Sequence, residues 1–203
     1  MKVAVYLAFK DSGKWAEFST HPLISLKFLE VFNENEVLDA DLVIDGTGEL
    51  WPKIPESIPV LTHSLYPLPQ TNHCVVRTCL WPGFWEKNIW EATGSEDHLF
   101  TIQKLLTPLN QQLIQVSNTP GLVAPRILAT IINEAAYTLK EGIANAGNID
   151  VAMKLGTNYP EGPVEWAKRI GAINVKNLLE HLSKSDARYN PCPDFINLLE
   201  NAC

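Results

Sequence analysis

The sequence has no cluster of basic residues and an excess of acidic ones. Sixteen Lys and Arg stand against 23 Asp and Glu, which gives a formal net charge of −7. Proteins that follow a phosphate backbone need Lys and Arg gathered on one face or along one segment. We therefore expect no nucleic acid among the partners of this protein.

Long hydrophobic runs are also missing. An apolar stretch such as residues 127–132 is bounded by Arg126 and Asn133, and it is far shorter than the roughly 20 residues that span a bilayer. The N-terminal segment MKVAVYLAFK lacks the length and the cleavage site of a signal peptide and is typical of a first strand. The sequence thus predicts a cytoplasmic protein without a membrane span.

The few cysteines and histidines do not form metal or redox motifs. Four cysteines show no C-x-x-C pair, and five histidines show neither H-x-x-x-H nor H-E-x-x-H spacing. Zinc sites and dithiol redox centres depend on such spacings. We expect no metal and reduced thiols.

The first 117 residues alternate between strand and helix patterns. With 46% hydrophobic and 19% charged residues, the chain of 203 residues has the composition of a globular protein. Periodicity and turn residues predict strands over 3–8, 41–45, 58–62, 74–80 and 113–117, and helices over 22–32 and 97–106. This alternation predicts an α/β domain over residues 1–117.

After Thr119-Pro120-Gly121 the pattern becomes helical. Pro125 can open a helix with a broad apolar face that ends near Gly142. A second helix is expected to be capped by Asn148 or Asp150 and to end at Gly156. Its Ala152, Met153 and Leu155 are expected to point inward, and two further helices are expected from Pro163 and through Val175–Leu182. The sequence predicts an all-helical domain over residues 118–203.

Several motifs of this helical half occur in a fixed order. They are Thr119-Pro120-Gly121-Leu122-Val123, Arg126, Asn133-Glu134-Ala135, Glu141-Gly142, Ile149-Asp150-x-Ala152-Met153-Lys154-Leu155-Gly156, Tyr159-Pro160-x-Gly162-Pro163-x-Glu165, Ile170-Gly171 and Arg188-Tyr189-x-Pro191-x-Pro193. This order resembles the C-terminal domain of the 3-hydroxyacyl-CoA dehydrogenases of fatty acid metabolism. The resemblance implies a Rossmann-like domain followed by this helical domain, an acyl-CoA site and a homodimer through the helical half. The motif residues themselves are mostly turns and helix ends, so they specify a fold rather than a reaction.

The first half departs from that family where NAD would bind. Family members carry G-x-G-x-x-G after the first strand, so that backbone N–H groups receive the pyrophosphate. Here residues 9–15 read FKDSGKW, with one glycine and two bulky aromatic side chains, Phe9 and Trp15. Gly46-Thr47-Gly48 follows the strand ADLVID but does not lead into a helix. We therefore expect the protein to bind no cofactor.

The acid–base pair of the family is also incomplete. The family places a His at a strand end and a Glu twelve residues later. Here Glu91 remains, whereas Thr78 or Cys79 occupies the His position, depending on a one-residue shift. Ser64 resembles the substrate-contacting serine of the family. The family asparagine before Arg126 is replaced by Pro125, and Lys168 stands where Asp is usual.

Three hypotheses follow. The first is a dehydrogenase-like protein that does not carry out NAD-dependent oxidation but keeps a cleft between its halves for an acyl-CoA-type ligand, faced by Glu91 and Ser64. The second is an active oxidoreductase of the same class, in which an altered loop still holds NAD and His63 or His73 replaces the missing base. The third is a structural dimer or a partner subunit. The candidate site residues are thus Glu91, Ser64 and His63.

Overall fold

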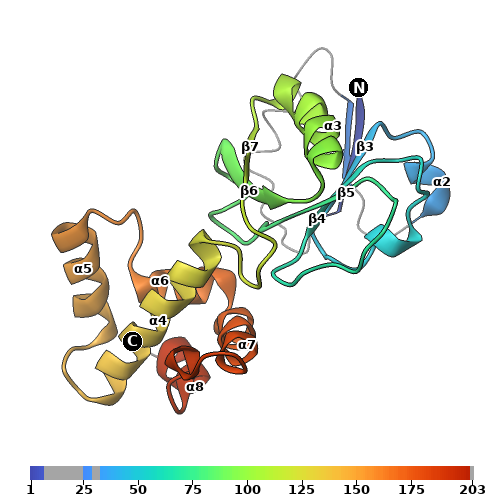
Figure 1. Ribbon diagram of the computed structural model, residues 1–203. Coiled ribbons are helices and arrows are strands. Elements are labelled where there is room, and N and C mark those ends of the chain that lie inside the picture. The colour runs from blue at the N-terminus through green and yellow to red at the C-terminus, as the bar shows by residue number, and fades with distance from the viewer. Residues whose placement is uncertain (7–24, 29–32, 202–203) are drawn as a thin grey trace. The chain divides into compact units, whose positions relative to one another are not determined.

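The computed structural model describes residues 1–6, 25–28 and 33–201. The chain divides into two compact units, 1–122 and 123–203 (Figure 1). The sequence placed the boundary after residue 117. Residues 118–122 belong to the first unit, because the N–H of Gly121 donates to the carbonyl of Leu65 at 2.6 Å and holds this segment against the sheet.

The first unit is built on a seven-stranded sheet with the order β2-β1-β3-β4-β5-β6-β7. All neighbouring strands run parallel except β5 and β6, which are antiparallel. The strands are β1 (Lys2–Tyr6), β2 (Ser25–Phe28), β3 (Leu42–Asp45), β4 (Val60–His63), β5 (Val75–Thr78), β6 (Ile89–Thr93) and β7 (Gln112–Gln115). The α/β class predicted from the alternation of patterns is confirmed.

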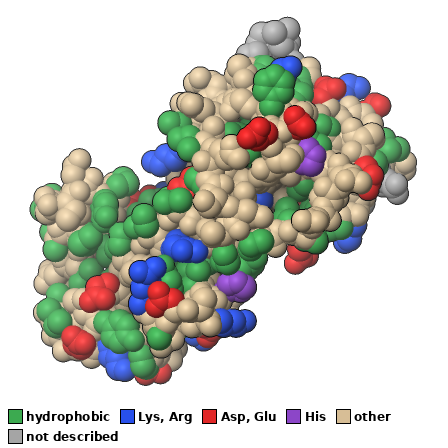
Figure 2. Space-filling view, in the orientation of Figure 1, with side chains coloured by type: hydrophobic (Ala, Val, Ile, Leu, Met, Phe, Trp, Pro, Cys, Tyr) green, Lys and Arg blue, Asp and Glu red, His purple; other side chains and the backbone are tan. Residues whose placement is uncertain are grey.

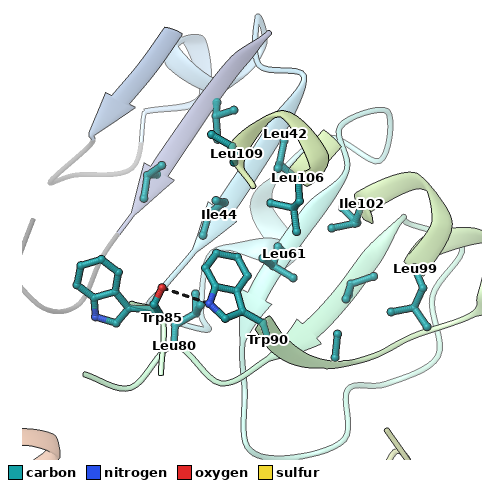
Figure 3. Packing of buried hydrophobic residues seen from close by; sticks show 14 residues of the cluster. Leu42, Ile44, Leu61, Leu80, Trp85, Trp90, Leu99, Ile102, Leu106 and Leu109 are labelled. Atoms are coloured by element: carbon teal, nitrogen blue, oxygen red, sulfur yellow. Dashed lines mark hydrogen bonds between the residues drawn. The ribbon is translucent and has the colours of Figure 1, made fainter. Parts of the chain in front are cut away.

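Two hydrophobic clusters form on this sheet because successive strand residues point to opposite faces. Val76 joins the cluster that α3 (Glu96–Leu106) covers with Leu99, Ile102 and Leu106 (Figure 3). Val75 joins the other cluster, which packs under α2 (Glu34–Val37) and the short 3₁₀ helix η1 (Trp51–Lys53). The helix α3 continues into η2 (Thr107–Leu109), which leads into β7.

Three tryptophans of the first unit lie in its interior, whereas Trp51 is half-buried. Trp81, Trp85 and Trp90 are each at most 2% exposed. The indole N–H of Trp90 donates to the carbonyl of Trp85 at 3.2 Å, the dashed contact in Figure 3. Each buried indole removes a large apolar area from water.

The predicted helix over residues 22–32 is wrong for its central part. Residues 25–28 form β2, whose Ser25 N–H donates to the carbonyl of Met1 at 2.8 Å. Leu26 and Phe28 fit a period of two as well as a helical face, and periodicity does not separate the two in so short an apolar run. Pairing with β1 decides for the strand.

The second unit is all-helical, as predicted. It contains α4 (Ala124–Lys140), α5 (Ala146–Thr157), α6 (Pro163–Ile170), α7 (Ala172–Ser183), η3 (Ala187–Tyr189) and α8 (Phe195–Glu200). Pro125 lies in the first turn of α4, where its missing N–H costs nothing. Pro163 opens α6 in the same way.

The expectations for α5 are partly wrong. Asn145, not Asn148 or Asp150, caps this helix, and its side chain accepts from the N–H of Asn148 at 2.9 Å. The helix passes through Gly156 and ends at Thr157. Its buried face carries Ala146, Ile149 and Asp150, whereas Ala152 and Leu155 are exposed, Leu155 by 83%, and Met153 is half-buried.

Buried polar side chains hold the helices of the second unit together. The Asp150 carboxylate accepts from the N–H groups of Val164 (2.8 Å) and Glu165 (3.2 Å) at the start of α6. A side chain at Gly162 would clash with that carboxylate, since a Cβ there would lie 2.1 Å from its Oδ1. The amide of Asn133 binds the backbone of Asn190 (2.9 Å) and Cys192 (2.8 Å). The motif residues therefore serve the fold, as predicted.

Candidate functional site

The carboxyl ends of the central strands gather the candidate site residues. The strands β3, β4 and β5 end there with Asp45, His63 and Thr78. Since β6 runs antiparallel to β5, it begins at the same edge and brings Glu91 there. Ligands of open α/β sheets bind at this edge. We call it the carboxyl edge.

The backbones of Ser64 and Glu91 are linked through one residue. The N–H of Ser64 donates to the carbonyl of Thr78 at 3.0 Å, and the Thr78 hydroxyl donates to the carbonyl of Glu91 at 2.7 Å. Ser64 and Glu91 are both half-buried. The structure thus brings these two candidate residues to one edge of the first unit.

Cys79, one of the two residues that the sequence offers for the His position, follows β5 and lies within the electrostatic influence of Glu91. Its thiol is 4% exposed, and burial raises its pKa, an effect to which the charge of the Glu91 carboxylate adds. The hydroxyl of Thr78 instead donates to the backbone carbonyl of Glu91. A buried thiol with a raised pKa keeps its proton at neutral pH, so it does not act as a general base.

His63 is engaged by the backbone around it. Its Nδ1 accepts from the N–H of Leu80 at 3.0 Å, which places the proton of the neutral ring on Nε2. Burial lowers the pKa of His63 to about 4, although contact with the Thr78 backbone and the charge of Asp45 act in the opposite direction. The ring lone pair that a general base would use is therefore occupied.

The hydroxyl of Ser64 is bound within its own turn. Its Oγ donates to the carbonyl of Tyr66 at 2.8 Å and accepts from the N–H of Tyr66 at 3.1 Å. Such a turn is a common way to close a loop after a strand. A substrate would have to replace the bond to the carbonyl in order to receive the hydroxyl proton.

His73 lies away from these residues. It precedes β5, whereas Ser64 follows β4, and the two strands run parallel, so the two residues lie at opposite edges of the sheet. The ring is 3% exposed, and its Nε2 lies 2.7 Å from the carbonyl of Ile58. The structure does not bring His73 to the carboxyl edge.

The Gly46-Thr47-Gly48 turn does not offer a phosphate cradle. The N–H groups of Thr47 and Gly48 both donate to the Asp45 carboxylate, each at 3.0 Å. The same carboxylate accepts from Leu50, Trp51 and Thr62 and is fully buried. A phosphate here would meet a fixed negative charge instead of free donors, so these residues do not fit the pyrophosphate of NAD. Residues 9–15, with Phe9 and Trp15, lie outside the described residues.

Arg77 is a buried charge that the sequence reasoning missed. It lies in β5, is 1% exposed, and donates to the carbonyls of Ser64 (3.2 Å) and Thr119 (3.0 Å) and to the side chain of Asn118 (3.0 Å). The available signal was an arginine inside the otherwise apolar strand CVVRTCL. A charge in such a run needs buried partners.

In the described part of the chain, no group of three or more His, Cys, Asp and Glu residues could hold a metal ion. Cys74, Cys79 and Cys192 are free thiols. None of the helices over the described ranges is long and apolar enough to cross a membrane.

The described residues form a Rossmann-like sheet domain followed by an all-helical domain. The chain superposes on the crystal structure of (S)-3-hydroxybutyryl-CoA dehydrogenase from Ralstonia eutropha with a TM-score of 0.69 at 20% identity, covering 98% of this chain and 93% of that one. At that identity the likeness shows the fold alone.

Sequence comparison identifies the relatives of the helical unit. Residues 121–202 match the family model of the 3-hydroxyacyl-CoA dehydrogenase C-terminal domain. The helical unit is thus similar to that domain, as the motifs predicted. The chain is 37% identical over 110 residues to a 3-hydroxybutyryl-CoA dehydrogenase of Bradyrhizobium diazoefficiens, which is 53% of this chain and 38% of that protein.

A second relative matches a similar share of the chain. The identity to the 3-hydroxyadipyl-CoA dehydrogenase of Escherichia coli is 40% over 95 residues, which covers 44% of this chain and 20% of that enzyme. The matches thus span well under half the length of these curated relatives. The activity of those enzymes is not carried over to this chain by such matches.

Proposed function

We propose that this protein is a 3-hydroxyacyl-CoA dehydrogenase-like protein that binds an acyl-CoA-type ligand but does not oxidise it with NAD. The observation that carries the proposal is the pair formed by Cys79 and Glu91. The carboxylate that would orient a general base is present, but Cys79, whose pKa its charge helps to raise, is a buried thiol. His63, the nearest imidazole along this edge, has its Nδ1 occupied by Leu80.

The test combines an activity assay with a binding assay on the full chain. (S)-3-hydroxybutyryl-CoA and NAD are supplied, and NADH is followed by its absorbance. Binding of butyryl-CoA and of NADH is measured separately by calorimetry. We expect butyryl-CoA to bind, NADH not to bind, and no NADH to form above the blank.

Each other outcome selects one of the remaining hypotheses. Turnover of the hydroxyacyl-CoA would contradict the proposal and establish a rebuilt oxidoreductase. The absence of both turnover and acyl-CoA binding would leave the third hypothesis, a structural dimer or partner subunit. A Cys79→His variant sharpens the test, because it places an imidazole beside Glu91; Cys79→Ala is its matched control.

We also propose that the protein forms a homodimer through α4. Two large apolar side chains at the start of this helix, Val123 (48%) and Ile127 (55%), are exposed in the single chain. Exposed apolar patches of this kind mark association surfaces. Light scattering should give twice the mass of the chain, and Ile127→Asp should dissociate the dimer.

The control for the dimer is Ile173→Asp on α7. Ile173 is 46% exposed, so the variant has the same change of charge on a similarly exposed isoleucine of the same unit. We expect it to remain dimeric. A monomer in the unaltered protein at tens of micromolar would contradict the dimer proposal without touching the proposal on acyl-CoA binding.

A further inference from the structure

The guanidinium of Arg77 is buried without a counter-charge. Its three acceptors, named above, are neutral, and its Nε has no hydrogen-bond partner. No carboxylate of the described residues forms an ion pair with it. Burial lowers the pKa of Arg77 to about 10. An uncompensated buried charge and an unpaired N–H both cost free energy.

A pocket of about 220 Å³ adjoins this arginine. Val75 and Arg77 both line it, as expected for residues two apart on one face of a strand. The loop before β5 supplies the opposite wall. The described lining residues are Leu68, Pro69, Gln70, Thr71, Val75, Arg77, Thr93, Gly94, Ser95, His98 and Asn118.

The surroundings of the pocket favour a negative charge. None of the described lining residues is acidic. Ser95 is the N-cap of α3, a helix of 11 residues whose N-terminal end carries partial positive charge. Three acidic residues flank the lining segment 93–95 in the sequence, namely Glu91 on β6 and Glu96 and Asp97 in the first turn of α3. They do not line the pocket, and they make no ion pair with Arg77.

We propose that this pocket binds a small monocarboxylate, whose carboxylate group pairs with the guanidinium of Arg77. One fixed cation calls for one negative charge, and a carboxylate accepts the planar donors of arginine in a charge-assisted pair. Leu68, Pro69 and Val75 provide apolar walls for a short aliphatic tail. The ligand class is thus a short-chain aliphatic acid.

The pocket has a different lining from the candidate site at the carboxyl edge, which it meets only through the bond from Arg77 to the Ser64 carbonyl. His63, Ser64, Cys79 and Glu91 are all missing from its described lining. A loss of acyl-CoA binding would therefore leave this proposal intact, and the reverse also holds.

The test follows the arginine Nε–H signals of the ¹⁵N-labelled full chain by NMR. The chain has four arginines, Arg77, Arg126, Arg169 and Arg188, so four signals are expected. Each is assigned by its loss in a single Arg→Gln variant, and the Arg77 signal is also assigned by elimination if Arg77→Gln does not fold. Sodium butyrate is titrated at constant ionic strength, with butyramide as the uncharged probe.

We expect butyrate to shift the Arg77 signal in a saturable way, with a dissociation constant of about millimolar order for so small a ligand. Butyramide should leave the signal in place. Arg77→Gln should weaken butyrate binding about tenfold or more, as the loss of a charge-assisted bond implies, whereas Arg169→Gln on the surface of α6 should not.

Three results of the butyrate and butyramide titrations would overturn the proposal. They are a linear shift without saturation, an equal shift with butyramide, and a saturable shift confined to another arginine. The first two show that no carboxylate is recognised, and the third places the site elsewhere. Inorganic phosphate at the same ionic strength should shift the Arg77 signal less than butyrate, and a stronger effect of phosphate would contradict the assignment to carboxylates.

Discussion

The helical unit and the sheet unit treat their buried polar side chains differently. In the helical unit, Asp150 and Asn133 each bind two backbone groups from distant segments and so fix how the helices meet. At the carboxyl edge of the sheet unit, His63 and Thr78 also bind backbone groups, but they do so at the edge where open α/β sheets bind ligands. The comparison teaches that the motif residues that give the likeness to the dehydrogenase helical domain are not the residues of the candidate site.

The largest effect is expected at Gly162. Gly162→Val would place side-chain atoms on the Asp150 carboxylate that caps α6. Overpacking together with the lost cap should lower the free energy of unfolding by about 3 kcal/mol or more. Urea denaturation measures the change.

The control for this prediction is Gly156→Ala in α5. A Cβ at Gly156 meets nothing within 4 Å, so alanine should be neutral or stabilise the helix by up to about 1 kcal/mol. Equal losses from the two substitutions would show that the motif glycines do not act through the Asp150 contact. The statement that Asp150 fixes how the helices of the second unit meet would then be contradicted.

The next effect is a pH dependence in the sheet unit. The pKa of His63 is about 4 in the folded chain and near 6.5 when unfolded. Between these values the unfolded chain binds a proton that the folded chain does not, so the free energy of unfolding falls as the pH drops from about 6.5 to about 4. At about 1.4 kcal/mol per pKa unit, the full effect is about 3 kcal/mol.

The variant that isolates this effect is His63→Gln. Glutamine has an amide oxygen for the Leu80 N–H but no titratable group. Urea denaturation at pH 7 and pH 4.5, followed by tryptophan fluorescence, should show a smaller loss of stability in the variant than in the unaltered chain. Identical losses would mean that His63 is not the group that responds.

Asn133 should have a somewhat smaller effect. Asn133→Ala removes the amide that binds Asn190 and Cys192, and we expect a loss of about 2 kcal/mol in the free energy of unfolding. Asn177→Ala, on the exposed side of α7, should change it by less than about 0.5 kcal/mol. Thermal denaturation compares the two variants. A negligible loss of stability in Asn133→Ala would mean that Asn133 does not help to fix how the helices meet.

The smallest effect concerns the cap of α5. Asn145→Ala should cost about 1 kcal/mol, because the side chain accepts the N–H of Asn148. Asn148→Ala should cost close to nothing, since the exposed Asn148 contributes only its backbone to that bond. A larger loss of stability in Asn148→Ala than in Asn145→Ala would support Asn148 as the cap, as the sequence pattern predicted.

Local signals in the sequence were sufficient for much of the fold. Prolines mark the first turns of α4 and α6, and the run ADLVID marks β3. Each of these elements could be predicted from a few neighbouring residues. The failure at residues 25–28 has a physical reason, because pairing with β1 is a long-range contact that no local period encodes.

The candidate site was predicted less well than the fold. The sequence brought Ser64 and Glu91 to one edge but did not distinguish Thr78 from Cys79, since the direction of a side chain depends on strand register. Arg77 was missed because two of its acceptors, Asn118 and Thr119, come from a segment 41 and 42 residues further on. Such burial arises only when the chain has folded.

The contacts of Arg77 bear on the order in which the chain folds as it is synthesised. Both the strand β7 and the segment 118–121, which binds Arg77 and Leu65, belong to the sheet unit. Domains fold as units during synthesis, and contacts between distant residues form late. The sheet unit therefore stays incomplete until residue 121 has left the ribosome, followed by the first residues of α4. Until then Arg77 lacks two of its hydrogen-bond acceptors, Asn118 and Thr119.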